Sequence, residues 1–124
     1  MKLVDSINFV AFYDKIKDQA MPVATAYKLS KIYKQVKEDE TFYHDKLRAI
    51  LLDCGELDEQ GNLIPTEDNK GVKIKPDKQQ DCIDAINDLQ EIESTITFEP
   101  ISLSVLDGLE VTPSDLDGVI GFFE

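Results

Sequence analysis

Three side chains of this sequence have types that could support metal or nucleophilic chemistry: His44, Cys54 and Cys82. A structural zinc site needs about four nitrogen or sulfur ligands at close spacing. The chain has one histidine and two cysteines, and it contains no Cys-x-x-Cys or His-x-x-x-His pair. Nucleophile elbows and glycine-rich phosphate-binding or dinucleotide-binding motifs are also missing. The sequence therefore predicts no catalytic residue, no metal site and no cofactor, and we expect that the protein is not an enzyme.

The two cysteines fall within the apolar stripes of two predicted helices, Cys54 at the end of one and Cys82 near the start of the other. Buried free thiols in a reducing compartment are the favoured interpretation. A disulfide and a reactive thiol are the alternatives.

A turn-rich stretch supplies oxygen ligands that suggest calcium: Asp58, Asn62, Glu67 and Asp68. A calcium-binding loop of the EF-hand type places ligands at alternate positions and a glycine at the sixth. Gly61 is the fourth residue when Asp58 is counted as the first. The spacing therefore argues against a calcium loop.

A second group of carboxylates follows steps of three and four along a predicted helix: Asp81, Asp84, Asp88 and Glu91. Such spacing places them on one helix face. Neighbouring acids on an exposed face lack the burial that separates the pKa values of catalytic carboxylates. A solvated acidic face is the favoured interpretation.

The net charge of −12 is distributed unevenly. Residues 1–48 hold nine Lys and Arg against seven Asp and Glu, whereas residues 76–124 hold one Lys against twelve acids. Phosphate groups would be repelled by the acidic half, so direct binding to nucleic acid is not expected. Lysines at 28, 31, 34 and 37 recur every three residues and so drift around a helix. They predict a solvated face or ion pairs with the acidic half.

The longest predicted element covers residues 22–54 and reads as one amphipathic helix. Pro22 suits the first helical turn, and Gly55 suits a left-handed residue after the last turn. An apolar seam recurs at alternating steps of three and four, with Glu40 as its one charged member. Its positions are Ala26, Leu29, Tyr33, Val36, Glu40, Tyr43, Leu47, Ile50 and Cys54. This seam needs a partner surface, from the same chain or from a second copy.

Shorter elements are predicted around the long helix. We expect an edge strand at 2–4, a helix capped by Asp5 or Ser6 and ending near Lys17, and a β-hairpin of 63–65 with 72–74. A second clear helix starts at Pro76 and runs to about Glu93, followed by a strand at 94–98 and short C-terminal helices near 101–106 and after Thr112.

These elements predict a mainly α fold of the α+β type: a long antiparallel helical hairpin with a small β-hairpin or sheet and short C-terminal helices. The 124 residues fit one interaction domain, helical and mildly basic over 1–54, a hairpin arm over 55–75, and acidic over 76–124. No apolar run approaches the roughly 20 residues of a membrane span, and the start does not resemble a secretory signal. We expect a soluble protein without membrane partners.

Residues expected to contact other proteins come from the long helix, the acidic face and the apolar C-terminus. Phe122 and Phe123 would dock on their own chain or, alternatively, in a neighbouring subunit. The candidate interaction residues are Tyr33, Glu40, Tyr43, Asp81, Asp84, Asp88, Glu91, Phe122 and Phe123.

Three stretches give the sequence a resemblance to small acidic proteins of tailed bacteriophages: 22–32, the turn 55–62, and the ending from 98 through 116. Proteins of this group are often encoded near virion and assembly genes. The resemblance implies a phage structural or assembly accessory protein that contacts other phage proteins or its own copies. It would reside in the host cytoplasm or in the virion.

The alternative function is an acidic inhibitor that imitates the nucleic-acid backbone and occupies a DNA-binding protein of the host.

Overall fold

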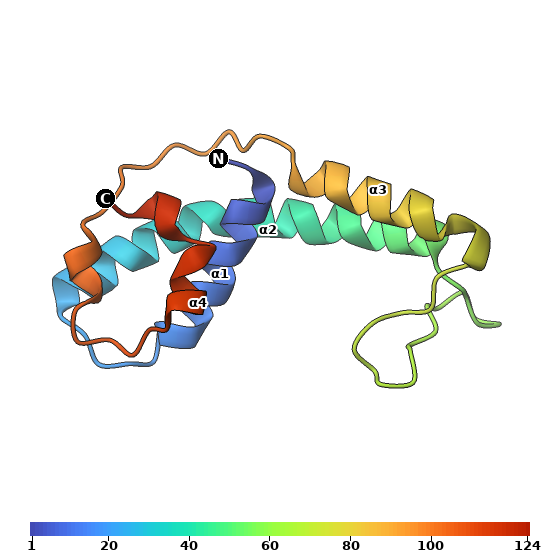
Figure 1. Cartoon of the computed structure of the whole chain (residues 1–124), viewed down its shortest axis with the longest axis horizontal. Helices are drawn as coiled ribbons and strands as arrows, with labels where there is room; N and C mark the ends of the chain where they lie inside the picture. The colour runs from blue at the N-terminus through green and yellow to red at the C-terminus, as the bar shows by residue number, and fades with distance from the viewer. The chain divides into compact units, whose positions relative to one another are not determined.

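The computed structural model describes all residues from 1 to 124, and it is mainly helical, as predicted (Figure 1). Short 3₁₀ helices accompany the α-helices at Pro76–Lys78, Leu103–Leu106 and Ile120–Phe122. The α-helices are α1 (Leu3–Ile16), α2 (Val23–Cys54), α3 (Gln79–Gln90) and α4 (Pro113–Asp117).

Helix α2 is continuous over its whole predicted length. Its first intrahelical bond joins the Ala26 N–H to the Pro22 carbonyl at 3.0 Å, so the proline begins the helix as expected. Gly55 ends it for a different reason than predicted, because its backbone is not left-handed. A Cβ at Gly55 would lie 2.4 Å from Leu63 Cδ2 and 2.5 Å from the Leu51 carbonyl oxygen. Close packing, and not a positive φ, requires glycine here.

The chain forms two compact units, which are described separately below. Unit 1 comprises Met1–Thr41 and Glu93–Glu124, and unit 2 comprises Phe42–Ile92. Helix α2 supplies its first part to unit 1 and its last part to unit 2. The single domain expected from the chain length stays a prediction.

In unit 1, α1 packs antiparallel on the first part of α2. The rings of Tyr13 and Tyr33 stack with centroids 4.3 Å apart, and Ser6 Oγ donates to Asp39 Oδ2 at 2.7 Å. The buried positions of α2 deviate from the predicted seam at its start, because Ala26 is exposed while Thr25 and Ile32 are buried. The core of the unit consists of Phe9, Val10, Phe12, Ile16, Leu29, Ile32, Val36, Leu106, Val119, Phe122 and Phe123.

The two C-terminal phenylalanines lie inside this core. The Phe122 ring centroid is 4.7 Å from the centroids of both Phe9 and Phe98, and Phe123 meets Phe12 edge-on at 6.1 Å. Phe122 is 1% exposed and Phe123 is 8% exposed. They dock on their own chain, as one of the two predicted alternatives has it, and their role as interaction residues stays a prediction.

Helix α1 begins earlier than predicted, at Leu3, so residues 2–4 form no edge strand. Asp5 caps it from inside the first turn by accepting the Lys2 N–H at 2.9 Å. Ser6 is fully buried and bonds to Asp39 in place of capping the helix. Lys2 keeps a single antiparallel bridge to Glu93.

The C-terminal part of unit 1 is fastened by polar contacts. Thr112 and Asp115 form the predicted capping box of α4. Lys15 Nζ lies 2.8 Å from Asp115 Oδ1, which ties α1 to α4. The Gln19 side chain donates to the Glu110 carbonyl at 3.1 Å and accepts from the Glu110 N–H at 2.8 Å.

The strand predicted at 94–98 does not form. Figure 1 shows this segment as an extended stretch without a strand beside it. The Ser94 N–H donates to the Met1 carbonyl at 2.8 Å, and Ser94 Oγ donates to Asp39 Oδ2 at 2.5 Å. Alternating β-branched residues favour an extended backbone, but a strand also needs a paired neighbour.

In unit 2, α3 packs antiparallel on the last part of α2. Gln90 Nε2 donates to the Tyr43 hydroxyl at 3.3 Å at one end, and Lys78 Nζ lies 3.6 Å from Asp53 Oδ2 at the other. Helix α3 ends at Gln90, before the predicted Glu93, so Ile92 is 43% exposed and does not complete the apolar stripe. The buried apolar residues of this unit are Tyr43, Cys54, Cys82 and Leu89.

The predicted β-hairpin of the arm is not confirmed, because its segments meet at isolated antiparallel bridges and form no strand. These bridges join Gly55 to Ile74, Leu57 to Leu63, and Pro65 to Val72. Two turns built on aspartate separate them. No helix of the protein is both long enough and apolar enough to span a bilayer.

Candidate functional site

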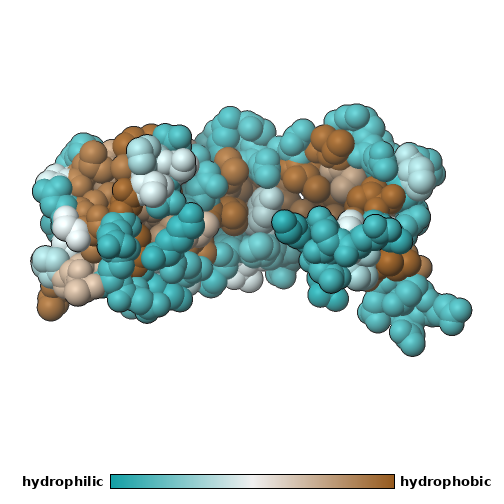
Figure 2. All heavy atoms as spheres, turned by 60° about the horizontal axis from the view of Figure 1, so that its bottom comes forward, coloured by the Kyte–Doolittle hydropathy of each residue, from teal (hydrophilic) through white to brown (hydrophobic).

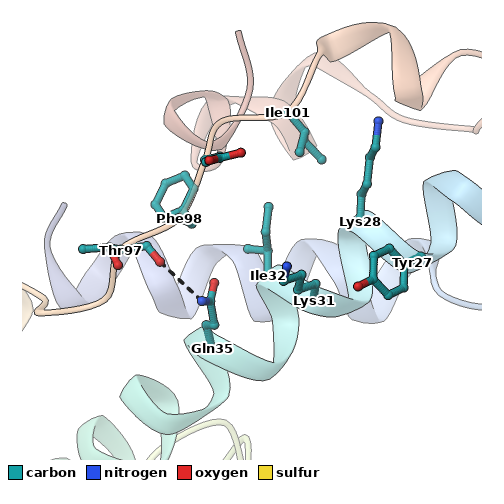
Figure 3. Close-up of a pocket in the computed structure, with 9 residues that line it drawn as sticks. Tyr27, Lys28, Lys31, Ile32, Gln35, Thr97, Phe98 and Ile101 are labelled. Carbon is teal, nitrogen blue, oxygen red and sulfur yellow. Dashed lines mark hydrogen bonds between the residues drawn. The ribbon is translucent and has the colours of Figure 1, made fainter.

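The best candidate for a functional site is a groove in unit 1, which we call the α2 groove (Figure 3). One wall comes from the first part of α2 and the other from the extended segment that follows residue 94. Its volume is about 510 Å³. The lining residues are Tyr27, Lys28, Lys31, Ile32, Gln35, Thr97, Phe98, Glu99 and Ile101.

Apolar side chains from both walls face the α2 groove. Ile32 is 5% exposed and belongs to the core, and the half-buried Phe98 stacks on Phe122 with ring planes 22° apart. Tyr27, by contrast, is 65% exposed at the edge of the groove. Figure 2 shows that apolar atoms reach the surface of each unit among hydrophilic ones. The groove therefore combines a packed apolar floor with an accessible aromatic rim.

The extended wall of the groove has an open backbone. Gln35 Nε2 donates to the Thr97 carbonyl at 3.3 Å and so holds the wall to α2. The Ile96 N–H bonds to Ser94 Oγ at 3.1 Å. The backbone N–H groups of Thr95, Thr97, Phe98 and Glu99 have no partner in the protein.

The groove also carries free positive charge. Lys28 and Lys31 are exposed and have no carboxylate within 4.0 Å. Lys37, farther along α2, is already paired with Glu40 and lies 5.8 Å above the Tyr33 ring centroid. The Glu40 carboxylate raises the pKa of the Lys37 ammonium above its ordinary value. Two of the predicted lysines thus face the groove without an ion-pair partner.

The predicted interaction residues of α2 lie outside the groove. Tyr33 is half-buried against Tyr13, Glu40 is occupied by Lys37, and Tyr43 is 7% exposed with its hydroxyl bonded to Gln90. The Tyr33 and Tyr43 contacts join α2 to α1 and α3, whereas the Glu40 pair stays within α2.

The predicted acidic face lies in unit 2. Asp81, Asp84 and Asp88 are exposed on α3, and Glu91 follows its last turn. Asp84 Oδ1 accepts from Gln80 Nε2 at 2.9 Å. The acidic face and the α2 groove therefore belong to different units.

Of the residues first considered for chemistry, the two cysteines are neighbours and His44 is not part of their group. His44 is exposed on α2, with its ring edge-on to Tyr43 at 5.7 Å. Cys54 and Cys82 are buried free thiols, as favoured by the sequence, and burial together with the neighbouring Cys54 raises the pKa of Cys82. No group of three or more His, Cys, Asp and Glu side chains is arranged to hold a metal ion.

The turn-rich acids of unit 2 serve the local backbone. Asp58 Oδ1 accepts the N–H groups of Gln60 at 2.9 Å and Asn62 at 3.0 Å. Asp68 accepts from the Thr66 hydroxyl and from the Lys70 N–H, and these bonds lower its pKa. Both carboxylates cap turns.

No protein-family model matches the chain, and neither does any curated protein or solved structure.

Sequence reasoning did not find the α2 groove, because its walls are about 65 residues apart in the chain and no local pattern joins them. The available signals were Tyr27, an aromatic residue outside the predicted seam, and the unpaired lysines beside it.

Proposed function

We propose that this protein is a structural or assembly accessory protein of a bacteriophage and that it works through protein–protein contacts. The partners are other phage proteins or further copies of the chain, in the host cytoplasm or in the virion. The phage assignment rests on the sequence resemblance.

The observation that carries the contact function is the α2 groove. It joins an accessible aromatic side chain, Tyr27, with an apolar floor at Ile32 and two unpaired lysines. Aromatic residues surrounded by polar groups are enriched where proteins bind each other. Lys28 and Lys31 add a local positive charge to a chain of net charge −12. Such a site attracts an acidic partner, and the acidic surface of a further copy of the chain meets that requirement as well.

The proposal is tested by the composition of phage particles and assembly intermediates from cells in which the gene carries Tyr27→Ala. We expect the unaltered protein to be recovered with particles or intermediates and the variant to be depleted from them. Tyr27 is 65% exposed, so its loss leaves the core intact. A protein that is absent from every particle fraction, and that light scattering finds monomeric in solution, would remove this proposal.

A second candidate function is supported by α3. Its acids at 81, 84 and 88 are exposed, and no Lys or Arg occurs after Lys78. An uninterrupted acidic surface can imitate a nucleic-acid backbone and occupy a host DNA-binding protein.

Salt dependence separates the two functions. Under the inhibitor hypothesis, the protein recovers a host nuclease or polymerase from lysate at low salt and loses it at high salt. Reversing the face with Asp84→Lys and Asp88→Lys would abolish that recovery. Recovery of phage proteins alone, unaffected by these changes, would reject the inhibitor.

A further inference from the structure

We propose that the α2 groove binds an extended peptide segment of a partner protein, which pairs with the open backbone at 95–99 as an added strand. The segment carries an apolar and an acidic side chain at alternate positions. This inference rests on the proposed contact function and names the chemistry of the partner.

The open backbone is the first argument. Thr95, Thr97 and Glu99 have unpaired N–H groups at alternate positions of an extended stretch, where such groups point to one edge. Residues 94–98 favour such a conformation through their β-branched alternation. An extended backbone with unpaired donors is a template for another strand, and strand addition is a recurring mode of peptide recognition.

The position of the groove beside this backbone is the second argument. Figure 3 shows Gln35 and Thr97 at one end of the pocket, with Ile101 and Lys28 at the other. The Gln35 amide already donates to the Thr97 carbonyl, as the backbone of an added strand would. An added strand therefore takes this carbonyl over from Gln35 and lies between the extended wall and α2.

Charge defines the peptide. Lys28 and Lys31 line the groove without ion-pair partners, and Glu99 is its one carboxylate. Side chains of a strand point to one face at every second residue. The peptide residue that faces Ile32 and Ile101 is therefore apolar. The peptide residue two positions away meets the lysines and is acidic.

The test uses the full chain labelled with ¹⁵N and a defined probe, the peptide acetyl-Thr-Val-Thr-Glu-Thr-Val-Thr-amide. We expect amide shifts at 95–99 and slowed hydrogen exchange at alternate residues of that stretch. Two further probes are N-methylated, one at the odd-numbered amides and one at the even-numbered amides. One of them should lose binding and the other should keep it, because only one edge of the peptide pairs with the protein. Replacing the probe's glutamate with lysine should weaken binding, since it then faces two cations.

Matched variants of α2 complete the test. Lys31→Ala should weaken the affinity for the probe roughly two- to fivefold, as expected for one exposed ion pair. Lys34→Ala removes an exposed lysine of the same helix that does not line the groove, and it should leave the affinity unchanged. Equal losses in both variants would indicate general charge attraction and overturn the site.

The proposal is overturned if the probe leaves the amides at 95–99 unshifted, or if both N-methylated probes bind alike. Shifts of these amides that depend on protein concentration without the probe would identify a second copy as the occupant. These results are obtained on the isolated protein. The probe can fail to bind while particle fractions still contain the protein. A negative result here is therefore distinct from a failure of the proposed function.

Discussion

Units 1 and 2 share one helix but are stabilised in different ways. Unit 1 joins both ends of the chain around a core of eleven buried side chains with an aromatic cluster at its centre. Unit 2 is a local excursion of the chain, held by a short helix pair and isolated bridges. Cooperative stability follows buried apolar area, so unit 2 should open at a lower free-energy cost than unit 1. The candidate binding groove lies on the better-packed unit, as a preorganised site requires.

The largest effect is expected from Phe122→Ala in unit 1. Removing a ring that is 1% exposed should lower the free energy of unfolding by about 3–5 kcal/mol, since a cavity remains among Phe9 and Phe98. Chemical denaturation followed by circular dichroism measures the loss. The control is Ile120→Ala, which is 54% exposed and should change stability by about 0.5 kcal/mol or less. Similar losses in both variants would contradict the placement of the C-terminus in the core.

Leu89→Ala makes the corresponding test in unit 2. Leu89 is 5% exposed, and we expect a loss of about 2 kcal/mol, near the lower end for such a change, because few other side chains enclose it. Hydrogen exchange should accelerate in α3 while α1 keeps its protection. If α1 loses protection to the same extent, the two units unfold as one and the comparison fails. Ile83→Ala, at a position 53% exposed, is the control.

Asp39→Ala should lower the free energy of unfolding of unit 1 by about 1–3 kcal/mol. Asp39 Oδ2 accepts from both Ser6 and Ser94, and the fully buried Ser6 hydroxyl would lose its partner. Asp39→Asn keeps an acceptor oxygen and should lose less. Thermal unfolding compares the unaltered protein with the two variants. If the alanine variant is as stable as the unaltered protein, the hydrogen bonds to Asp39 do not hold the segment after α3.

The smallest effect concerns the ion pair between Lys15 and Asp115. Lys15 is the largest cause that lowers the pKa of Asp115, followed by the Thr112 backbone. A lowered folded-state pKa stabilises the protein above the ordinary aspartate pKa of about 3.9, and this contribution is lost as pH falls through the folded value. Lys15→Met should raise the pKa of Asp115 and reduce the loss of stability that occurs as the pH falls. Carboxyl resonances followed by NMR give the pKa, and an unchanged value would reject the pair.

Local signals in the sequence predicted the helices better than the pairings. Pro22 and Gly55 gave the ends of α2 correctly, and Thr112 with Asp115 gave the start of α4. The segment 94–98 has the residues of a strand, but the chain provides it with no paired neighbour. The reason for Gly55 also lay outside its local sequence, in the side chain of Leu63. Contacts between distant segments decide these features and the α2 groove, and a single sequence does not encode them in a local pattern.

The central claim, that the protein works by contact through the α2 groove, is tested most directly by a photo-crosslinking residue placed at Tyr27 in infected cells. Its control carries the same residue at His44, which is exposed on α2 but belongs to unit 2. We predict that position 27 crosslinks to one phage protein through an acidic segment and that position 44 does not. The same products from both positions, or none from position 27, would contradict the account.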